Sequence, residues 1–139
     1  MELKHNNHSA VHIIDDDDAI RDSLSMLLQS EGLNTSTYES AQEFLKEYQT
    51  NLPGCIVLDI SMQGMTGLEL QNVLIEEKVL LPIIFITGHG DEVMHEQAMQ
   101  GGAFDFIEKP FPVQTFLERV KMAIKTSENQ LITVKEINV

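Results

Sequence analysis

The stretch Val11-His12-Ile13-Ile14-Asp15-Asp16-Asp17-Asp18 decides the fold, because an apolar run ends directly in four aspartates. Residues 11–15 are few, apolar and rich in β-branched side chains, which predicts a buried β-strand. Four neighbouring carboxylates repel one another and add nothing to a hydrophobic core. A bound cation explains them best, or the start of a helix that needs acidic caps.

Two later segments favour the cation. Cys55-Ile56-Val57-Leu58-Asp59 is a second apolar run that ends in an aspartate, and Asp105-Phe106-Ile107-Glu108-Lys109-Pro110 reads as a short strand that ends in a lysine. Alone, Asp59 could be an ordinary turn residue. Together, three strand ends that carry acid, acid and base predict one shared site.

Composition limits the class of protein. A chain of 139 residues with 42% apolar content fits one globular domain. Nine basic against 22 acidic side chains give a net charge of −13, so this chain would be repelled by nucleic acid. No apolar run approaches the ~20 residues that cross a membrane, and the polar start of the chain predicts no secretory signal. We therefore expect neither a nucleic-acid nor a membrane partner.

Cys55 is the only cysteine, which excludes an internal disulfide and fits a reducing cytoplasm. Its place inside an apolar run predicts a buried core residue.

Strand and helix patterns alternate five times along the chain. We expect strands at 11–15, 33–38 (an edge strand), 55–59, 83–87 (a central strand) and 104–108. We expect helices from the N-cap Asp18 to Glu31, after Ser40 with Glu43 completing a capping box, at 68–77, up to about 100, and at 112–126. Such alternation is typical of a parallel sheet covered by helices on both faces.

The chain ends are expected to lie outside this unit. Residues 1–9 are polar and predict disorder, whereas residues 10–126 carry the whole alternation. Residues 127–139 read as a tail or the start of a linker, although Leu131-Ile132-Thr133-Val134 could add a strand.

Ligands of open α/β sheets bind at the carboxyl ends of the strands. Five side chains follow or end these strands and are therefore expected to converge at one edge: Asp15, Asp16, Asp59, Thr87 and Lys109.

The order of these residues resembles the receiver domain of two-component response regulators, over about residues 10–126. The likeness is to the FixJ-type subfamily, and three stretches carry it: 11–16 (VHIIDD), 86–91 (ITGHGD) and 104–111 (FDFIEKPF). Each motif alone is weak, but the ordered set is specific. The resemblance implies a flavodoxin-like (βα)5 doubly wound parallel sheet with strand order 2-1-3-4-5.

The resemblance also implies that Asp59 receives a phosphoryl group from a histidine of a sensor kinase. Carboxylate oxygens suit Mg²⁺, so Asp16 and Asp59 can bind it directly, and Asp15 through water. The resemblance adds the backbone carbonyl of Ser61 as a ligand. Lys109 would neutralise the phosphoryl oxygens, with Thr87 donating its hydroxyl to them.

In similar domains the threonine and an aromatic residue of the last strand form the switch, here Thr87 and Phe106. The surface that responds would be residues 93–100 with 104–108, which makes a phosphorylation-dependent homodimer in similar regulators. The resemblance further implies a cis Lys109-Pro110 bond. Where many receivers have proline, this chain has Gln63, which predicts a looser loop.

Several readings of function remain open at this level. A receiver of this type can control transcription through an attached DNA-binding domain that is absent here, or can act alone through protein contacts. An aspartyl-phosphate phosphatase would need a second aspartate, and Asp59-Ile60-Ser61 lacks it. A degenerate, binding-only receiver would lack Asp16, Asp59 or Lys109. We expect a phosphoacceptor switch and not an enzyme.

Overall fold

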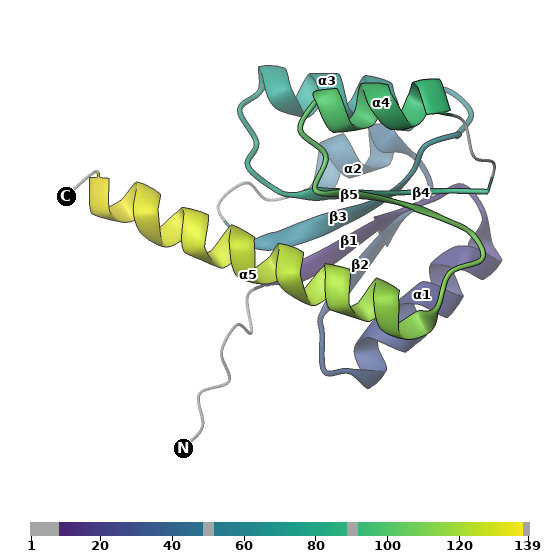
Figure 1. Ribbon diagram of the computed structural model, residues 1–139, viewed down its shortest axis with the longest axis horizontal. Coiled ribbons are helices and arrows are strands. Elements are labelled where there is room, and N and C mark those ends of the chain that lie inside the picture. The colour runs from purple at the N-terminus through teal and green to yellow at the C-terminus, as the bar shows by residue number, and fades with distance from the viewer. Residues whose placement is uncertain (1–8, 49–51, 89–91, 138–139) are drawn as a thin grey trace.

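The computed structural model describes residues 9–48, 52–88 and 92–137, with side chains described up to Gln130. The segment expected to be disordered, residues 1–9, lies outside this range except for Ser9. Ten elements alternate along the chain (Figure 1). They are β1 (Ala10–Ile14), α1 (Asp18–Ser30), β2 (Thr35–Tyr38), α2 (Ala41–Glu47), β3 (Gly54–Asp59), α3 (Gly67–Glu76), β4 (Ile83–Thr87), α4 (Glu92–Gln100), β5 (Asp105–Glu108) and α5 (Val113–Ile137).

All five strands pair in parallel in the order β2-β1-β3-β4-β5. This confirms the flavodoxin-like fold and the strand order expected from the sequence. The polar strand β2 lies at an edge, where one side needs no partner, whereas the apolar strand β4 lies inside the sheet. None of the helices in the described part of the chain combines the length and apolar character needed to cross a membrane.

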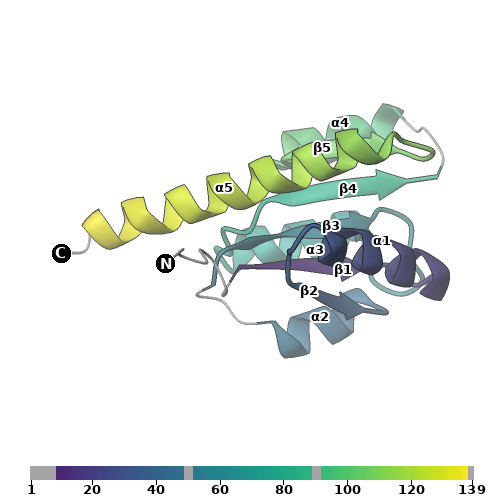
Figure 2. The same ribbon diagram turned by 90° about the horizontal axis from the view of Figure 1, so that it is seen from below.

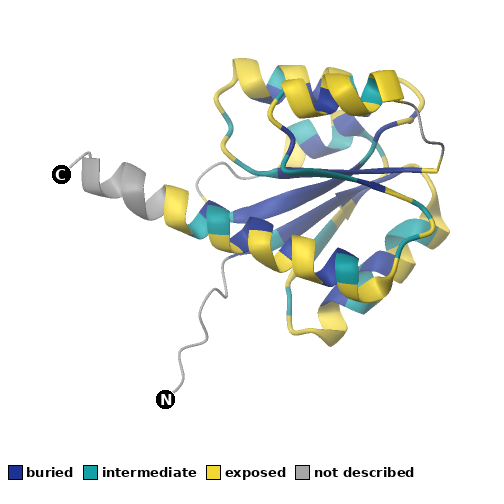
Figure 3. Ribbon diagram, in the orientation of Figure 1, coloured by how far each residue is buried: buried dark blue, intermediate teal, exposed yellow. Residues whose placement is uncertain are grey.

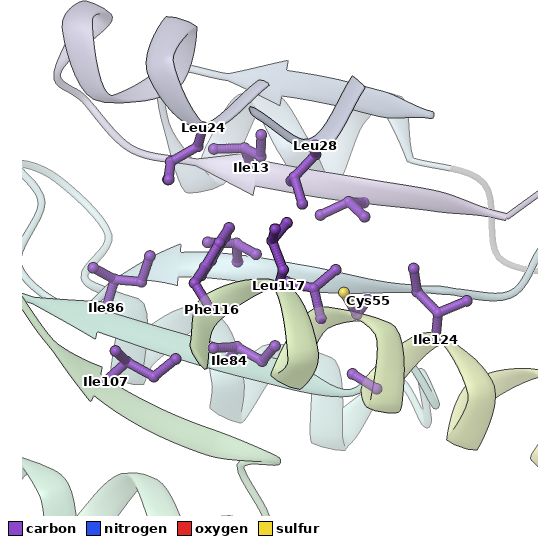
Figure 4. Close-up of a cluster of buried hydrophobic side chains, with 14 residues drawn as sticks. Ile13, Leu24, Leu28, Cys55, Ile84, Ile86, Ile107, Phe116, Leu117 and Ile124 are labelled. Carbon is purple, nitrogen blue, oxygen red and sulfur yellow. The ribbon is translucent and has the colours of Figure 1, made fainter. Parts of the chain in front are cut away.

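Two hydrophobic layers hold the helices on the sheet. Helices α1 and α5 cover one face, and α2, α3 and α4 cover the other (Figure 2). In the first layer Leu28 of α1 and Phe116 of α5 meet side chains of the strands, among them Ile84 (Figure 4). Figure 3 shows that the central strands consist mostly of buried residues, whereas the helices combine buried and exposed residues.

Cys55 lies in the first layer and is fully buried, as expected. Burial disfavours its thiolate and raises its pKa to about 12. The thiol is therefore a packing group.

The N-terminal caps of α1 and α2 differ slightly from the caps expected from the sequence. The N-cap of α1 is Asp17, not Asp18, and its carboxylate accepts the Ala19 and Ile20 N–H groups at 2.9 and 3.3 Å. This leaves Asp18 in the first turn, paired with Arg21. Both positions offer the same side chain, so the turn geometry of the chain leaving β1 decides between them.

Ser40 caps α2 as expected, accepting the Glu43 N–H at 3.0 Å. The Glu43 carboxylate, however, accepts from Glu39 at 2.8 Å, so the reciprocal bond of a capping box goes to the preceding residue. A full capping box instead begins α3, between Thr66 and Glu69.

Helix α5 is longer than the sequence predicted. It does not end near Thr126 but runs to Ile137, and the segment 131–134 is helix, not strand. No glycine or proline interrupts residues 113–137, so nothing in the sequence stops the helix. Its continuation contacts the sheet: the buried Gly54 N–H donates to Ser127 Oγ at 3.0 Å, and Ser9 donates to Glu128 at 3.0 Å.

The bond from Gly54 to Ser127 predicts a stability effect. Ser127→Ala leaves a buried N–H without its acceptor, which costs about 1–3 kcal/mol in the free energy of unfolding. Urea denaturation measures this loss. Ser23→Ala, at an exposed position of α1, is the matched control and should change stability by less than about 0.5 kcal/mol. Equal effects of the two substitutions would contradict the contact.

Candidate functional site

Three carboxylates meet at the carboxyl edge of the sheet. Strands β1 and β3 pair with Ile14 opposite Leu58, so the chain leaves both strands side by side. Asp15 and Asp16 follow β1, and Asp59 ends β3. One carboxylate oxygen from each of the three lies within 4.8 Å of the others. The structure therefore brings together the acidic residues that the sequence placed at two separate strand ends.

Backbone N–H groups hold one oxygen of each carboxylate. The Ser61 N–H donates to Asp59 Oδ1 at 3.1 Å, and the Asp17 N–H donates to Asp15 Oδ1 at 2.9 Å. These bonds fix the orientation of two side chains, and the second oxygen of each can face a cation.

The third carboxylate is held from the neighbouring loop. The Gln63 N–H donates to Asp16 Oδ2 at 3.4 Å, a long bond that links the two strand ends. Sequence reasoning treated Gln63 only as a missing proline and so missed this contact. Proline has no N–H, so the donor exists because the residue is not proline.

The environment of the cluster changes its acidity. Asp15 is 3% exposed, Asp59 is half-buried and Asp16 is exposed. The pKa of Asp59 is raised to about 6, mainly by burial and also by the charges of Asp15 and Asp16, against the opposing effects of the Ser61 hydrogen bond and the Lys109 charge. Burial also raises the pKa of Asp15. Asp15 and Asp59 thus resist ionising in this cluster, and a cation would relieve that cost.

Lys109 and Thr87 join the same edge from β5 and β4. The Lys109 N–H donates to the Thr87 carbonyl at 2.8 Å, which ties the two strand ends together. The Lys109 charge lowers the pKa of both Asp15 and Asp59, so its ammonium group acts on the cluster. Among the described side chains no ion pair within 4.0 Å joins Lys109 to these carboxylates. The Lys109-Pro110 bond is cis, as expected.

Thr87 is 2% exposed and shares one face of the sheet with Phe85 and Phe106. Phe106 is half-buried, and its ring lies against His95 of α4. The two expected switch residues therefore sit on the face that α4 covers. Residues 89–91, between Thr87 and α4, lie outside the described chain.

The donor atoms of this cluster also fit a bound cation. Within the described ranges this is the one cluster of His, Cys, Asp and Glu side chains able to hold a metal ion. Its donors are carboxylate oxygens, which suit Mg²⁺ and not the metals that prefer nitrogen or sulfur. Ser61 is exposed and touches Asp59 through its N–H; its carbonyl as a ligand stays a prediction.

The raised pKa of Asp59 predicts a pH-dependent stability difference. A carboxyl that binds its proton more tightly in the folded state stabilises the fold at acid pH, and that contribution is lost as the pH rises through about 6. Without divalent cations, Asp59→Asn should therefore be more stable than the wild type at about pH 7.5, with the gap shrinking toward about pH 4.5.

Urea denaturation in a chelator at both pH values measures that gap. Asp22→Asn, at an exposed position of α1, serves as the control for removing one negative charge. If the difference in the free energy of unfolding between Asp59→Asn and the wild type is the same at both pH values, the raised pKa of Asp59 is contradicted.

Known proteins resemble the chain closely. A family model for the response regulator receiver domain matches residues 11–121. The transcriptional regulatory protein TdiR of Thauera aromatica is 45% identical over 121 residues, which cover 87% of this chain and 53% of that protein. The response regulator protein TodT of Pseudomonas putida is 40% identical, covering 88% of this chain and 54% of that protein. The chain thus spans about half the length of these relatives.

Solved structures agree. The response regulator StyR matches with a TM-score of 0.90 and 35% identity, over 94% of this chain and 66% of that one. The structure FixJ-N matches with a TM-score of 0.76 and 36% identity, over 86% of this chain and 96% of that one. Since the family model spans most of the chain and FixJ-N shares its fold at 36% identity, this chain belongs to the response regulator receiver domains of two-component systems, in the FixJ-type group.

Proposed function

We propose that Asp59 accepts a phosphoryl group from a histidine of a sensor kinase, with Mg²⁺ bound beside it. The observation that carries this proposal is the gathering of Asp15, Asp16 and Asp59 within 4.8 Å, with the Lys109 charge acting on Asp15 and Asp59. If each of these residues had only a structural role of its own, nothing would require their side chains to lie together.

The reaction is a displacement at phosphorus. A carboxylate oxygen of Asp59 attacks, the P–N bond of the phosphohistidine breaks, and its electron pair stays on the imidazole, which leaves an acyl phosphate on Asp59. Bound Mg²⁺, held by Asp16 and Asp59, the Ser61 carbonyl and a water on Asp15, would neutralise charge on the phosphoryl oxygens. Lys109 stabilises the same charge from the β5 side.

The acyl phosphate would act as a switch. Thr87 donates its hydroxyl to the new phosphoryl group, and Phe106 moves into the space behind it. The moving surface is α4 with β5, through which two phosphorylated copies pair. Several relatives are named as transcriptional regulators and are longer than this chain, which supports transcriptional output through an attached DNA-binding domain.

We further propose a cytoplasmic location and residues 10–126 as the receiver unit, with 127–139 leading into a linker that begins as the continuation of α5. A stand-alone receiver that acts by protein contact is the alternative. It differs in one measurable respect, because its full-length gene product would end near this chain's last residue. Neither reading makes the chain a multiple-turnover enzyme.

Magnesium binding predicts a thermal shift. Mg²⁺ at about ten times its dissociation constant should stabilise the fold by roughly 1.4 kcal/mol, because only the folded chain gathers the three carboxylates. Thermal melts with and without Mg²⁺ measure the shift, which Asp16→Ala should abolish and the exposed control Asp22→Asn should keep. A shift of equal size in all three proteins would argue against the site.

Phosphorylation predicts a mass increment. With acetyl phosphate and Mg²⁺, intact mass spectrometry should show one phosphoryl group on the wild type and none on Asp59→Asn. Lys109→Met should slow the reaction at least tenfold, since it removes the charge that faces the phosphoryl oxygens. An increment that persists in Asp59→Asn would place the phosphoryl group elsewhere. If neither acetyl phosphate nor a panel of sensor kinases modifies the wild type, the binding-only reading holds.

A further inference from the structure

His95 forms a stack with the proposed switch residue. Its ring centroid lies 4.5 Å from that of Phe106, and the two ring planes are 10° apart. His95 is an exposed residue of α4, whereas Phe106 is a half-buried residue of β5. The stack is therefore a direct contact between the helix and the strand that make up the proposed responding surface.

Phe106 has a second aromatic neighbour. Phe85 pairs with Phe106 in the β4–β5 register, is fully buried, and lies 6.3 Å away with a tilt of 42°. The tight, parallel contact of Phe106 is with His95, and the looser one is with the core. We call this arrangement the α4-facing position of Phe106.

The chemistry of Phe106 makes the His95 contact important. A phenylalanine ring has no hydroxyl that could fix it by a hydrogen bond, so packing alone sets its position. Thr87 lies two residues beyond Phe85 on β4, on the same face of the sheet. A ring released from His95 can therefore turn toward Thr87 without leaving that face.

The other end of α4 is held separately. Gln71 of α3 is 3% exposed and donates its Nε2 to the Ala98 carbonyl at 2.9 Å. At Gly101 a Cβ would come within 2.7 Å of the Gln71 side chain, which shows how closely α3 and the end of α4 approach. The C-terminal end of α4 is thus fixed to α3, and the His95 contact lies toward the other end.

We infer that His95 is a positioning residue that holds Phe106 in its α4-facing position and so opposes the phosphorylated form. This inference rests on the proposed function for the role of the switch, but the contact itself can be tested without phosphorylation. Removing one aromatic stack shifts a two-position equilibrium by roughly two- to tenfold.

The direct test is an NMR measurement on the unphosphorylated full chain. Nuclear Overhauser effects between the Phe106 ring protons and the Thr87 methyl group report the turned-in position. His95→Ala should strengthen them by roughly two- to tenfold, and His95→Phe, which keeps an aromatic ring there, should leave them near the wild-type level. Glu96→Ala, an exposed neighbour on the same helix, is the control. No change in His95→Ala, or an equal change in Glu96→Ala, would overturn the inference.

A second readout ties the contact to function. The initial rate of phosphorylation by acetyl phosphate should rise roughly two- to tenfold in His95→Ala and return to the wild-type rate in His95→Phe. If His95→Ala raised the rate only by loosening α4, then His95→Phe should raise the rate as well. If the wild type takes up no phosphoryl group, the proposed function fails, whereas the Overhauser comparison still decides whether His95 holds Phe106.

Discussion

Repulsion among Asp15, Asp16 and Asp59 is the constraint on which the site depends. Parallel pairing of β1 with β3 brings their carboxyl ends together, so the fold itself forces the three carboxylates within 4.8 Å. Burial of Asp15 and Asp59 makes this more costly, which shows in their raised pKa values. Hydrophobic packing on both faces of the sheet offsets that cost, and a cation with a phosphoryl group would reverse it. A cation bound among the three carboxylates would therefore stabilise the folded chain.

The two faces of the sheet differ in their residues. The layer under α1 and α5 is a continuous apolar core. Farther along α5, the hydrogen bond from the Gly54 N–H to Ser127 also holds the helix against β3. The layer under α2, α3 and α4 contains Phe106, and Thr87 lies at its edge. Thr87, Phe106 and α4 therefore lie on the same side of the sheet, where the proposed switch would operate.

Much of the fold followed from sequence patterns because each pattern has one dominant cause. Short strand patterns that alternate with amphipathic helices favour a parallel sheet, and the strand order agrees with the family resemblance. The errors lie where two local solutions have nearly equal energy. Asp17 and Asp18 can both cap α1, and the segment 131–134 is β-branched enough for a strand, yet it follows a helix that nothing terminates.

The site was predictable in its side chains and not in its backbone. Strand position predicted that Asp15, Asp16, Asp59, Thr87 and Lys109 lie at one edge of the sheet, whereas their roles in metal binding and phosphoryl transfer stay predictions. The Gln63 N–H on Asp16 was not predictable, because backbone donors carry no signature in a sequence. The stack of His95 on Phe106 was missed for a related reason, since an exposed histidine reveals nothing about the ring that it meets.

Anomalous diffraction from crystals grown with Mn²⁺ would test the central claim most directly, since Mn²⁺ shares the preference of Mg²⁺ for carboxylate and water oxygens. We expect one strong anomalous peak among the three carboxylates, about 2.1 Å from oxygens of Asp16 and Asp59 and lost in Asp59→Asn. Well-ordered crystals with no peak at this edge of the sheet, or with a peak that persists unchanged in Asp59→Asn, would contradict it.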